Sequence, residues 1–265
     1  MLFFGEKMIL ALLFACGEKQ DVEIPEVVVK ESQETKVEAV VDTTKKKPAS
    51  FSKKKQGTLL LDGVEQTVFW DDGDTFSFSG SEGKKVKARL KGLNTLESYG
   101  PVHQWGDWTE AELYSFAKEG GVFASVEKWN CTDTKKGGGY GRILVDCPDF
   151  RKAILEAGLA HAFSVDQPAP AADVVAQQIG MDAQIGIWEK GVPKSLLTSI
   201  HSQDEKADKD AYNRVCQTET GQCDVVTHTE IYEVCQKVCQ DDSCMIYVPY
   251  NKRYGSDVAS CLKLP

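Results

Sequence analysis

Four short motifs in the middle of the chain carry the side chains best suited to chemistry. In chain order they are Asp72-Gly73-Asp74-Thr75, Arg89, Asn94-Thr95-Leu96-Glu97 and Tyr140-Gly141-Arg142. Carboxylates bind hard cations or take protons from water, and guanidinium groups bind oxyanions through paired hydrogen bonds. Each motif alone has a plain structural explanation, because an Asp-Gly sequence is common in hairpin turns and an arginine on a strand is usually solvated. Only their joint order can therefore indicate a shared site.

Short strands and helices are expected around these motifs. Residues 58–70 have the pattern of a strand interrupted by a turn at Asp62-Gly63, and residues 85–91 alternate between basic and apolar side chains. Further strands are expected at residues 76–78 and 141–147, and helices at residues 108–118, 150–159 and 173–188. This order predicts an α+β protein whose core is a five-stranded Greek-key barrel of the OB type, closed by helices.

Taken together, the four motifs resemble the staphylococcal nuclease (thermonuclease) family. The resemblance covers residues 58–192, about half of the chain. It includes Ala157-Gly158-Leu159-Ala160 after the second expected helix and Ile187-Trp188 at the end of the third. It implies an OB-type barrel with three helices, and an enzyme that hydrolyses the phosphodiesters of DNA and RNA with a calcium ion.

The resemblance also implies a calcium site made by the Asp74 carboxylate, the Asn94 side chain and the main-chain carbonyl of Thr95. The chain departs from the family's pattern at two positions, with Asn94 in place of the usual Asp and Leu96 in place of the usual Pro. An amide oxygen still binds calcium, but the site loses one negative charge. One unit-charge interaction at about 4 Å is worth about 4 kcal/mol at an effective dielectric near 20, so weaker calcium affinity is expected. Millimolar calcium sites nevertheless function outside cells.

By the same resemblance, Glu97 is the general base, Arg89 and Arg142 hold the phosphate, and Tyr140 lines the nucleotide pocket. Two guanidinium groups suit a phosphodiester because they clamp its oxygens with bidentate hydrogen bonds that lysine cannot form. A carboxylate that removes a proton from the attacking water contributes about 10²–10⁴-fold. The alternatives are structural: Glu97 as a surface acid, Arg89 as part of a charged strand face, and Arg142 as the first residue of a strand.

The overall charge favours a local binding surface. With 31 Lys+Arg and 40 Asp+Glu the net charge is −9, which excludes a polycation that coats nucleic acid. Substrate binding is therefore expected to depend on a basic stripe, Lys85, Lys87, Arg89 and Lys91, with Lys135 and Lys136 beside it. Of the histidines near the motifs, His103 is expected to pack and His161 to face solvent.

Residues 1–16 resemble an export signal. The eight-residue apolar run at residues 8–15 has the length of a signal-peptide core, and it is followed by Cys16. This ending resembles a bacterial lipobox, so we expect a lipid on Cys16 that anchors the protein in a membrane, with simple secretion as the alternative. Residues 17–57 contain one aromatic residue and no cysteine, which is typical of a disordered tether. No apolar run reaches the roughly 18 residues of a membrane-spanning helix, which excludes a multi-pass membrane protein.

The nine cysteines also favour export. If Cys16 carries a lipid, eight remain, which fits one disulfide in the middle region and three near the C-terminus. Cys131 and Cys147 flank the Gly-rich turn before Tyr140, and a bond between them would hold the loop that presents Arg142. The six C-terminal cysteines allow 15 pairings, and their spacing is unlike that of a zinc site. Residues 201–265 are expected to form a linker and a small cysteine-rich module stabilised by disulfides.

These observations together predict a calcium-dependent nuclease of the cell envelope that acts on DNA or RNA. Two other functions remain open. The first is a binding module with the same barrel, catalytically weak because of Asn94. The second is an envelope lipoprotein in which the cysteine-rich region makes the main interactions with other proteins.

Overall fold

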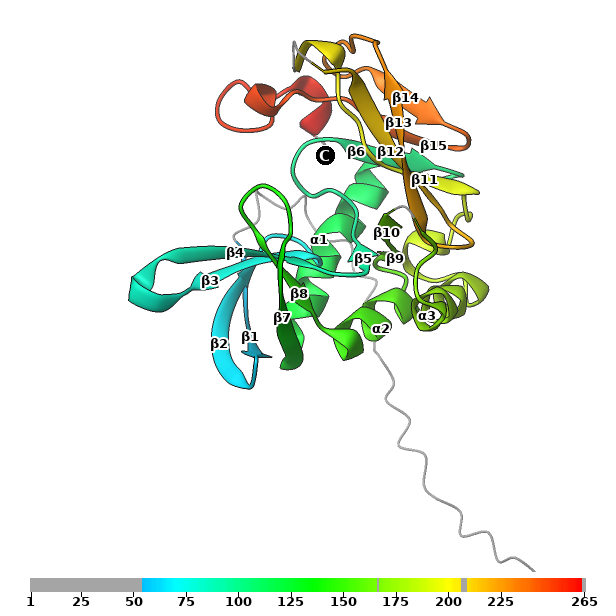
Figure 1. Ribbon diagram of the computed structural model, residues 1–265. Coiled ribbons are helices and arrows are strands. Elements are labelled where there is room, and N and C mark those ends of the chain that lie inside the picture. The colour runs from blue at the N-terminus through cyan, green and yellow to red at the C-terminus, as the bar shows by residue number, and fades with distance from the viewer. Residues whose placement is uncertain (1–53, 166, 206–208, 264–265) are drawn as a thin grey trace, which may run out of the picture. The chain divides into compact units, whose positions relative to one another are not determined.

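The computed structural model describes residues 54–165, 167–205 and 209–263 (Figure 1). This part of the chain is α+β, with a closed barrel, three α-helices and a disulfide-rich C-terminal region (residues 209–263). No helix within it is long and apolar enough to span a membrane. The predicted export signal at residues 1–16, the lipid on Cys16 and the tether as far as residue 53 lie outside the described residues.

Six strands close the barrel in the order β1-β2-β3-β4-β8-β7 (Figure 1). Neighbours pair antiparallel except at β4–β8 and at β1–β7, where parallel pairing closes the ring. The strands are β1 Lys55–Leu61, β2 Val64–Trp70, β3 Thr75–Ser79, β4 Lys85–Leu90, β7 Trp129–Gly137 and β8 Ile143–Asp146. Five barrel strands are predicted and six are present. The strand that the sequence analysis does not predict is β7, which alternates buried and exposed side chains only at its start and is polar afterwards. The closed barrel is compatible with an OB-type architecture.

The first hairpin forms where the sequence predicts a turn. Asp62 and Gly63 connect β1 to β2, and Leu61 pairs directly with Val64. Both turn residues have positive φ, 50° at Asp62 and 79° at Gly63. A two-residue loop with this backbone is a type I′ turn, which matches the twist of the strands and favours Asp-Gly. Strand β1 begins at Lys55, three residues before the predicted start of the domain.

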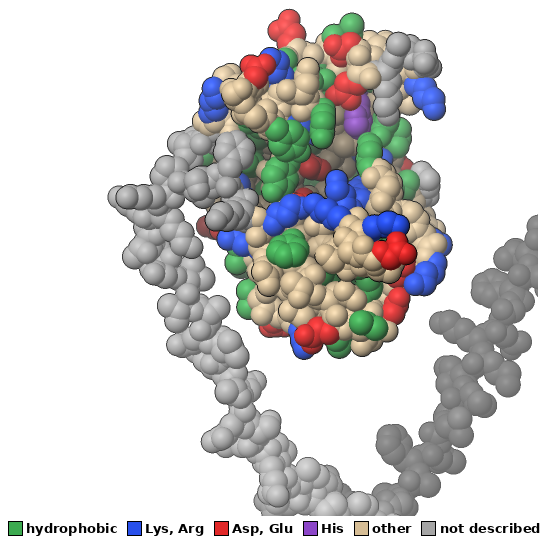
Figure 2. Space-filling model, turned by 90° about the vertical axis from the view of Figure 1, so that its left-hand side faces the viewer, with side chains coloured by type: hydrophobic (Ala, Val, Ile, Leu, Met, Phe, Trp, Pro, Cys, Tyr) green, Lys and Arg blue, Asp and Glu red, His purple; other side chains and the backbone are tan. Residues whose placement is uncertain are grey.

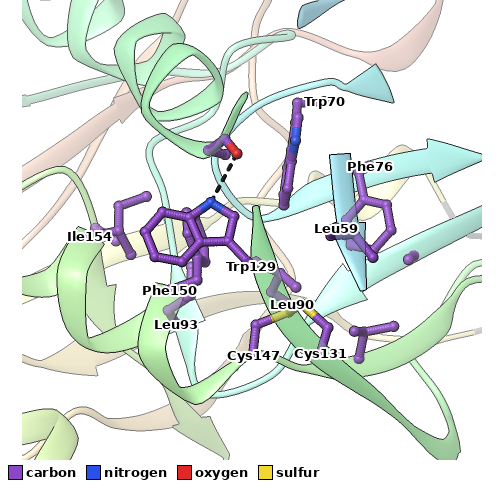
Figure 3. Close-up of a cluster of buried hydrophobic side chains, with 14 of the residues drawn as sticks. Leu59, Trp70, Phe76, Leu90, Leu93, Trp129, Cys131, Cys147, Phe150 and Ile154 are labelled. Carbon is purple, nitrogen blue, oxygen red and sulfur yellow. Dashed lines mark hydrogen bonds between the residues drawn. A yellow bond between two sulfur atoms is a disulfide. The ribbon is translucent and has the colours of Figure 1, made fainter. Parts of the chain in front are cut away.

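The interior of the barrel is filled by large aromatic side chains (Figure 3). Trp70 stacks against Phe150 with ring centroids 5.6 Å apart, and Trp129 meets Phe150 edge-on at 5.1 Å. The indole N–H of Trp129 donates a hydrogen bond to the main-chain oxygen of Ala124 (3.0 Å). Such rings contribute most of the buried apolar area and add about 0.5–1.5 kcal/mol per pair through their geometry. The core therefore gives the barrel a rigid frame.

A disulfide joins Cys131 of β7 to Cys147 beside β8, as the sequence analysis predicts. Both cysteines are buried at the edge of the aromatic core (Figure 3). They lie 16 residues apart in the sequence and enclose the Gly-rich turn. The bond therefore ties the two ends of the segment that presents Tyr140 and Arg142.

Three α-helices pack around the barrel, α1 Glu110–Val126, α2 Pro148–Glu156 and α3 Ala171–Asp182. Helix α1 starts with a capping box, in which the Thr109 side chain accepts from the Glu112 N–H and the Glu112 carboxylate accepts from the Thr109 N–H (2.9 Å). The predicted helix at residues 108–118 is extended to Val126. The helix expected at residues 173–188 stops at Asp182, and Gly186–Trp188 form a separate 3₁₀ turn.

Helix α1 continues through Gly120 and Gly121 because it packs tightly against a loop of the barrel. A Cβ at Gly120 would lie 3.3 Å from both the Cα and the nitrogen of Gly73. Glycine in a helix costs about 1 kcal/mol relative to alanine, and this contact explains the choice. The helix is thus positioned directly behind the first of the four motifs.

The C-terminal region shares its sheets with earlier parts of the chain. One sheet has the order β10-β13-β12-β11 and another the order β14-β15-β6, while β5 pairs with β9. The strands are β5 Leu93–Asn94, β6 Val102–Trp105, β9 His161–Ala162, β10 Ser164–Val165, β11 Ser195–Ser199, β12 Ala211–Gln217, β13 Gln222–His228, β14 Lys237–Gln240 and β15 Ser243–Ile246. Strands from both sides of residue 200, where the sequence analysis begins a linker and a separate module, therefore lie in common sheets (Figure 1).

Three further disulfides stabilise this region, and they join Cys216 to Cys223, Cys235 to Cys261 and Cys239 to Cys244. The division into one central and three C-terminal bonds is as predicted. The accompanying apolar core is small and consists of Leu197, Ile200, Val215, Tyr232, Val238, Met245 and Tyr247. Four disulfides indicate an extracellular or other oxidising compartment.

Candidate active site

The Asp72-Gly73-Asp74-Thr75 turn connects β2 to β3 and is fixed by its own first side chain. Asp72 Oδ1 accepts hydrogen bonds from the N–H groups of Asp74 (3.1 Å) and Thr75 (2.8 Å). Gly73 leaves no room for a side chain, since a Cβ there would lie 2.6 Å from Cγ2 of Thr95. The turn is therefore held tightly between α1 and the loop after β5, and its backbone sets the direction of the Asp74 carboxylate.

The Asp74 carboxylate is buried, with 1% of its residue surface exposed. Its Oδ1 accepts from Arg89 Nη1 (2.5 Å) and Thr75 Oγ1 (2.9 Å), and its Oδ2 accepts from the Thr95 N–H (2.8 Å). The second terminal nitrogen of Arg89, Nη2, donates to Oδ1 of Asn94 (2.5 Å). The structure thus brings four of the predicted site residues into one network, and both ends of the Arg89 guanidinium are oriented by it.

Behind Asn94 lies His161, which is 2% exposed. The prediction that His161 faces solvent is wrong, because β9 pairs with β5 and turns the imidazole inward. Its Nε2 lies 3.2 Å from Asn94 Nδ2, and its Nδ1 lies 2.9 Å from the main-chain oxygen of Ala162. Burial lowers the pKa of His161 to about 4, and the Arg89 charge acts in the same direction. The imidazole is therefore neutral at pH 7 and acts as an acceptor that orients the Asn94 amide.

His103 packs inside the protein, as predicted, and supports the Glu97 loop. It is 3% exposed, and its Nε2 accepts the Glu97 N–H at 3.2 Å. Burial lowers the pKa of His103 to about 3, so the ring remains a neutral acceptor. Sequence reasoning assigned no partner to this histidine, which sits on β6 and fixes the backbone of the predicted general base.

Negative charge accumulates around Glu97. Burial raises the pKa of the Glu97 carboxyl, and the neighbouring Asp74 charge raises it further. The pKa of Asp72 also lies well above its ordinary value, through burial and through the charges of Asp74 and Glu97. Positive charge from Arg89, Arg253 and Arg142 acts against the rise at Glu97. Three carboxylates and three guanidinium groups therefore interact in one small volume.

Arg142 lies at the end of the loop that connects β7 to β8, and this loop has unusual backbone geometry. Tyr140 before it has φ 51° and an 83% exposed surface, and the Arg142 guanidinium carbon lies 5.6 Å from the centre of the Tyr140 ring. Arg142 Nε donates to the oxygen of Gly139 (3.2 Å). Burial lowers the pKa of Arg142, and repulsion from Arg89 adds to the effect. In the part of the chain that the structure describes, no carboxylate forms an ion pair with Arg142, so its charge is available to a ligand.

These side chains open into a cleft of about 950 Å³. Figure 2 shows Lys and Arg side chains gathered along one side of a hollow, with hydrophobic side chains facing them. Of the predicted site residues, the cleft is lined by Arg89, Asn94, Glu97, Lys136, Tyr140 and Arg142. Asp74 and Thr95 lie behind this wall. Lys87 is exposed on β4 and is not part of the lining, whereas Lys91 of the predicted stripe is.

The opposite wall comes from residues that sequence reasoning did not assign to the site. Phe163, Tyr212, Arg214 and Arg253 all line the cleft. Tyr212 and Arg214 lie on β12, and Arg253 belongs to the loop after β15. The sequence around these residues carries no local signal for a site, because the pairing of β10 with β13 and of β13 with β12 brings distant parts of the chain together.

The predicted calcium ligands have suitable chemistry, since Asp74, Asn94 and Thr95 all offer hard oxygen atoms. Each oxygen accepts hydrogen bonds already, with Thr95 O bonded by Asn94 Nδ2 at 2.9 Å. A carbonyl oxygen has two lone pairs and a carboxylate about four, so each group keeps an acceptor position. Among the described residues, no three or more His, Cys, Asp and Glu side chains are grouped to hold a metal. A calcium ion here would therefore depend on one carboxylate and neutral oxygens, within reach of the charges of Asp72 and Glu97.

No protein-family model matches the sequence, and a comparison with curated proteins found no significant match.

Proposed function

We propose that the protein hydrolyses phosphodiester bonds of DNA or RNA in this cleft, with calcium as cofactor. The observation that supports the proposal is the position of Arg89, Glu97 and Arg142 on one wall of a single cleft. Two guanidinium groups would bind the nonbridging oxygens of a phosphate and offset the charge that develops on them. Glu97 would accept the proton of the attacking water.

Water and the phosphodiester would be the only reactants of this hydrolysis. A water oxygen attacks the phosphorus, its proton passes to Glu97, and the bond from phosphorus to one sugar oxygen breaks. That oxygen takes a proton from solvent, and Glu97 later returns its own. Calcium held by Asp74, Asn94 and the Thr95 carbonyl would supply Lewis-acid polarisation of a phosphoryl oxygen. The raised pKa of Glu97 makes its carboxylate a stronger base than a solvated glutamate.

The test is cleavage of labelled single-stranded and double-stranded DNA and RNA with calcium titrated from micromolar to millimolar. Wild-type protein should cleave, a chelator should stop cleavage, and Glu97→Gln and Arg142→Ala should each be severely impaired. Glu65→Gln is the matched control, because Glu65 is an exposed acid on β2 paired with Lys128. Cleavage that neither site variant affects would remove the assignment of the site.

A second candidate is a nucleic-acid-binding module with weak or absent catalysis. The Asn94 side chain favours this second candidate. It is a neutral amide bonded to Arg89 and His161, whereas a carboxylate at this position would give a metal site a second negative charge. Binding of an oligonucleotide at millimolar calcium without cleavage would support this candidate over the first.

The predicted location combines export to an oxidising compartment with a lipid anchor. The four disulfides agree with export to an oxidising compartment. Anchoring through a lipid on Cys16 is our proposal, and mass spectrometry of the mature N-terminus tests it. A Cys16→Ser variant should appear in the soluble fraction of cells that retain the wild-type protein in membranes.

A further inference from the structure

The C-terminal wall of the cleft contains an arginine that is held in an unusual way. Arg214 on β12 is half-buried, and its guanidinium carbon lies 5.9 Å from the centre of the Phe163 ring and 5.8 Å from that of Tyr212. Aromatic faces attract a guanidinium and fix its plane without using its N–H donors. Arg214 is therefore positioned by stacking, whereas Arg89 is positioned by hydrogen bonds.

The Arg214 side chain has an unsatisfied donor. Among the described residues its buried Nε lacks a hydrogen-bond partner, and no carboxylate pairs with the side chain. A buried unsatisfied donor costs about 1–3 kcal/mol, more when it is charged. By contrast, Arg151, which lines the same cleft, is paired with Asp146 and Asp173. An unpaired guanidinium that faces a cleft is a site for an oxyanion.

Arg214 is adjacent to the proposed reaction centre but separate from it. Arg89 and Arg214 lie at the same distance, 5.9 Å, from the centre of the Phe163 ring, so this ring is shared by the two guanidinium groups. Arg89 bonds Asp74 and Asn94, which fixes it on the barrel side. An anion on Arg214 would thus share the cleft with the phosphate on Arg89 and Arg142, with Phe163 next to both Arg89 and Arg214. Successive phosphates along a strand provide such a pair of anions.

We propose that Arg214 binds a second backbone phosphate of a single-stranded nucleic acid, next to the one that is cleaved. The C-terminal region then acts as part of the substrate site, and the cleft requires a strand with more than one phosphate. The inference rests on the proposed function and deepens it by naming the substrate class. A single strand is favoured because the cleft presents aromatic rings, among them the exposed Tyr140, against which unpaired bases stack.

The test compares a dinucleotide, which has one phosphodiester, with a longer single-stranded oligonucleotide. In Arg214→Gln, the KM for the longer strand should rise about tenfold more than the KM for the dinucleotide, because one charge-assisted contact is lost. Arg214→Lys should recover part of the loss. Lys237→Gln removes the same charge from an exposed position on β14 outside the cleft, and it should leave both KM values unchanged.

A binding measurement separates this inference from the proposed function. Fluorescence anisotropy of the labelled longer strand with Glu97→Gln protein in a chelator reports binding without cleavage. Each phosphate contact on a single strand contributes about 0.7 to the slope of log affinity against log salt, so adding Arg214→Gln should reduce the slope by about that amount. Inorganic phosphate alone should compete weakly with the strand, since it can occupy only one position.

The possible results distinguish the second phosphate site from the proposed function. If wild-type protein cleaves and Arg214→Gln behaves like Lys237→Gln, the second phosphate site is wrong and the proposed function stands. If Arg214→Gln impairs the dinucleotide as much as the longer strand, Arg214 acts at the cleaved phosphate, which also contradicts the inference. If the wild-type protein does not cleave but Arg214→Gln weakens binding and lowers the salt slope, hydrolysis fails and the phosphate site stands. Absence of both binding and cleavage overturns both.

Discussion

The two walls of the cleft are built by different means. The barrel wall is supported by an aromatic core, and its arginine Arg89 is bonded to Asp74 and Asn94. The C-terminal wall has a core of seven buried side chains and three disulfides. Its arginine, Arg214, lies against aromatic rings, and its Nε has no hydrogen-bond partner among the described residues. A network of paired charges fixes geometry, while an unpaired charge attracts a ligand. Under the proposed function, the barrel wall would orient the reacting groups and the C-terminal wall would add affinity.

The largest effect should come from removing the base on the barrel wall. Glu97→Gln should lower kcat by about 10²–10⁴, the usual contribution of a positioned general base, with little change in KM. Steady-state cleavage of an oligonucleotide measures both constants, with Glu65→Gln as the control. An unchanged kcat would show that the barrel wall does not supply the base, and the contrast between the two walls would fail.

Next in size is the loss of a guanidinium from the barrel wall. Arg142→Lys keeps the charge but removes bidentate donation, so kcat/KM should fall by about 10²-fold, as when one donor to a developing anion is deleted. The same substitution at half-buried Arg253 should cost less, because Arg253 is not one of the two guanidinium groups proposed to bind the phosphate. Equal losses at the two positions would contradict the division of roles.

Two disulfides of the C-terminal wall enclose chain segments of different length, and their removal should therefore affect stability differently. Replacing both Cys235 and Cys261 by alanine should lower the free energy of unfolding by about 3.5 kcal/mol, because their sequence separation is 26. Replacing Cys239 and Cys244, which are 5 apart, should cost about 2 kcal/mol. Denaturant titration of each double variant gives the values. A reversed order would mean that local strain or structure in the unfolded chain outweighs loop closure.

A smaller effect concerns pH. The positive charge of Arg253 lowers the pKa of Glu97, although burial and Asp74 leave that pKa raised overall. Removing the charge in Arg253→Gln should raise the pKa of Glu97 further. Because the base must be ionised, the acid limb of the pH–kcat profile should move to higher pH by a fraction of a unit. The Lys237→Gln profile serves as the reference, and a shift toward lower pH would contradict this assignment.

The smallest expected effect is on stability. A carboxyl whose pKa is raised by folding lowers the free energy of unfolding at pH values above its folded pKa, where it must be ionised in the folded protein. Below its unfolded pKa it is protonated in both states, and this loss of stability disappears. Glu97→Gln should therefore stabilise the protein at pH 8, by on the order of 1 kcal/mol or less, and should have no such effect at pH 4. Thermal melts at the two pH values provide the measurement. Equal melting temperatures of variant and wild type at pH 8 would show that the strain of charge at Glu97 is relieved by its arginine neighbours.

Local patterns predicted the parts of the structure that depend on neighbouring residues. The Asp62-Gly63 hairpin, the alternation of β4 and the Cys131–Cys147 bond all follow from short-range rules of turn chemistry, side-chain period and cysteine count. Strand β7 was missed because its second half is polar. The predicted helix stops at residue 118, whereas α1 continues through Gly120 and Gly121 because they pack against the loop at Asp72 and Gly73.

The C-terminal wall could not be predicted because nothing local marks it. Arg214 occurs in an ordinary strand, and its role depends on Phe163, which is about fifty residues earlier in the chain. His161 likewise looked like a solvent-facing residue after a helix, and only the pairing of β5 with β9 buries it. Long-range strand pairing is the information that composition and periodicity lack.

The pairing of β6 with β15 has a consequence for biosynthesis. Strand β6 is synthesised well before β15, so the sheet that the two strands share can form only after the chain as far as β15 has left the ribosome. The nearby Cys235–Cys261 bond closes later still, after the chain meets an oxidant. The cleft, which Met245 and Arg253 help to line, is therefore complete only after the strands of the barrel have been synthesised.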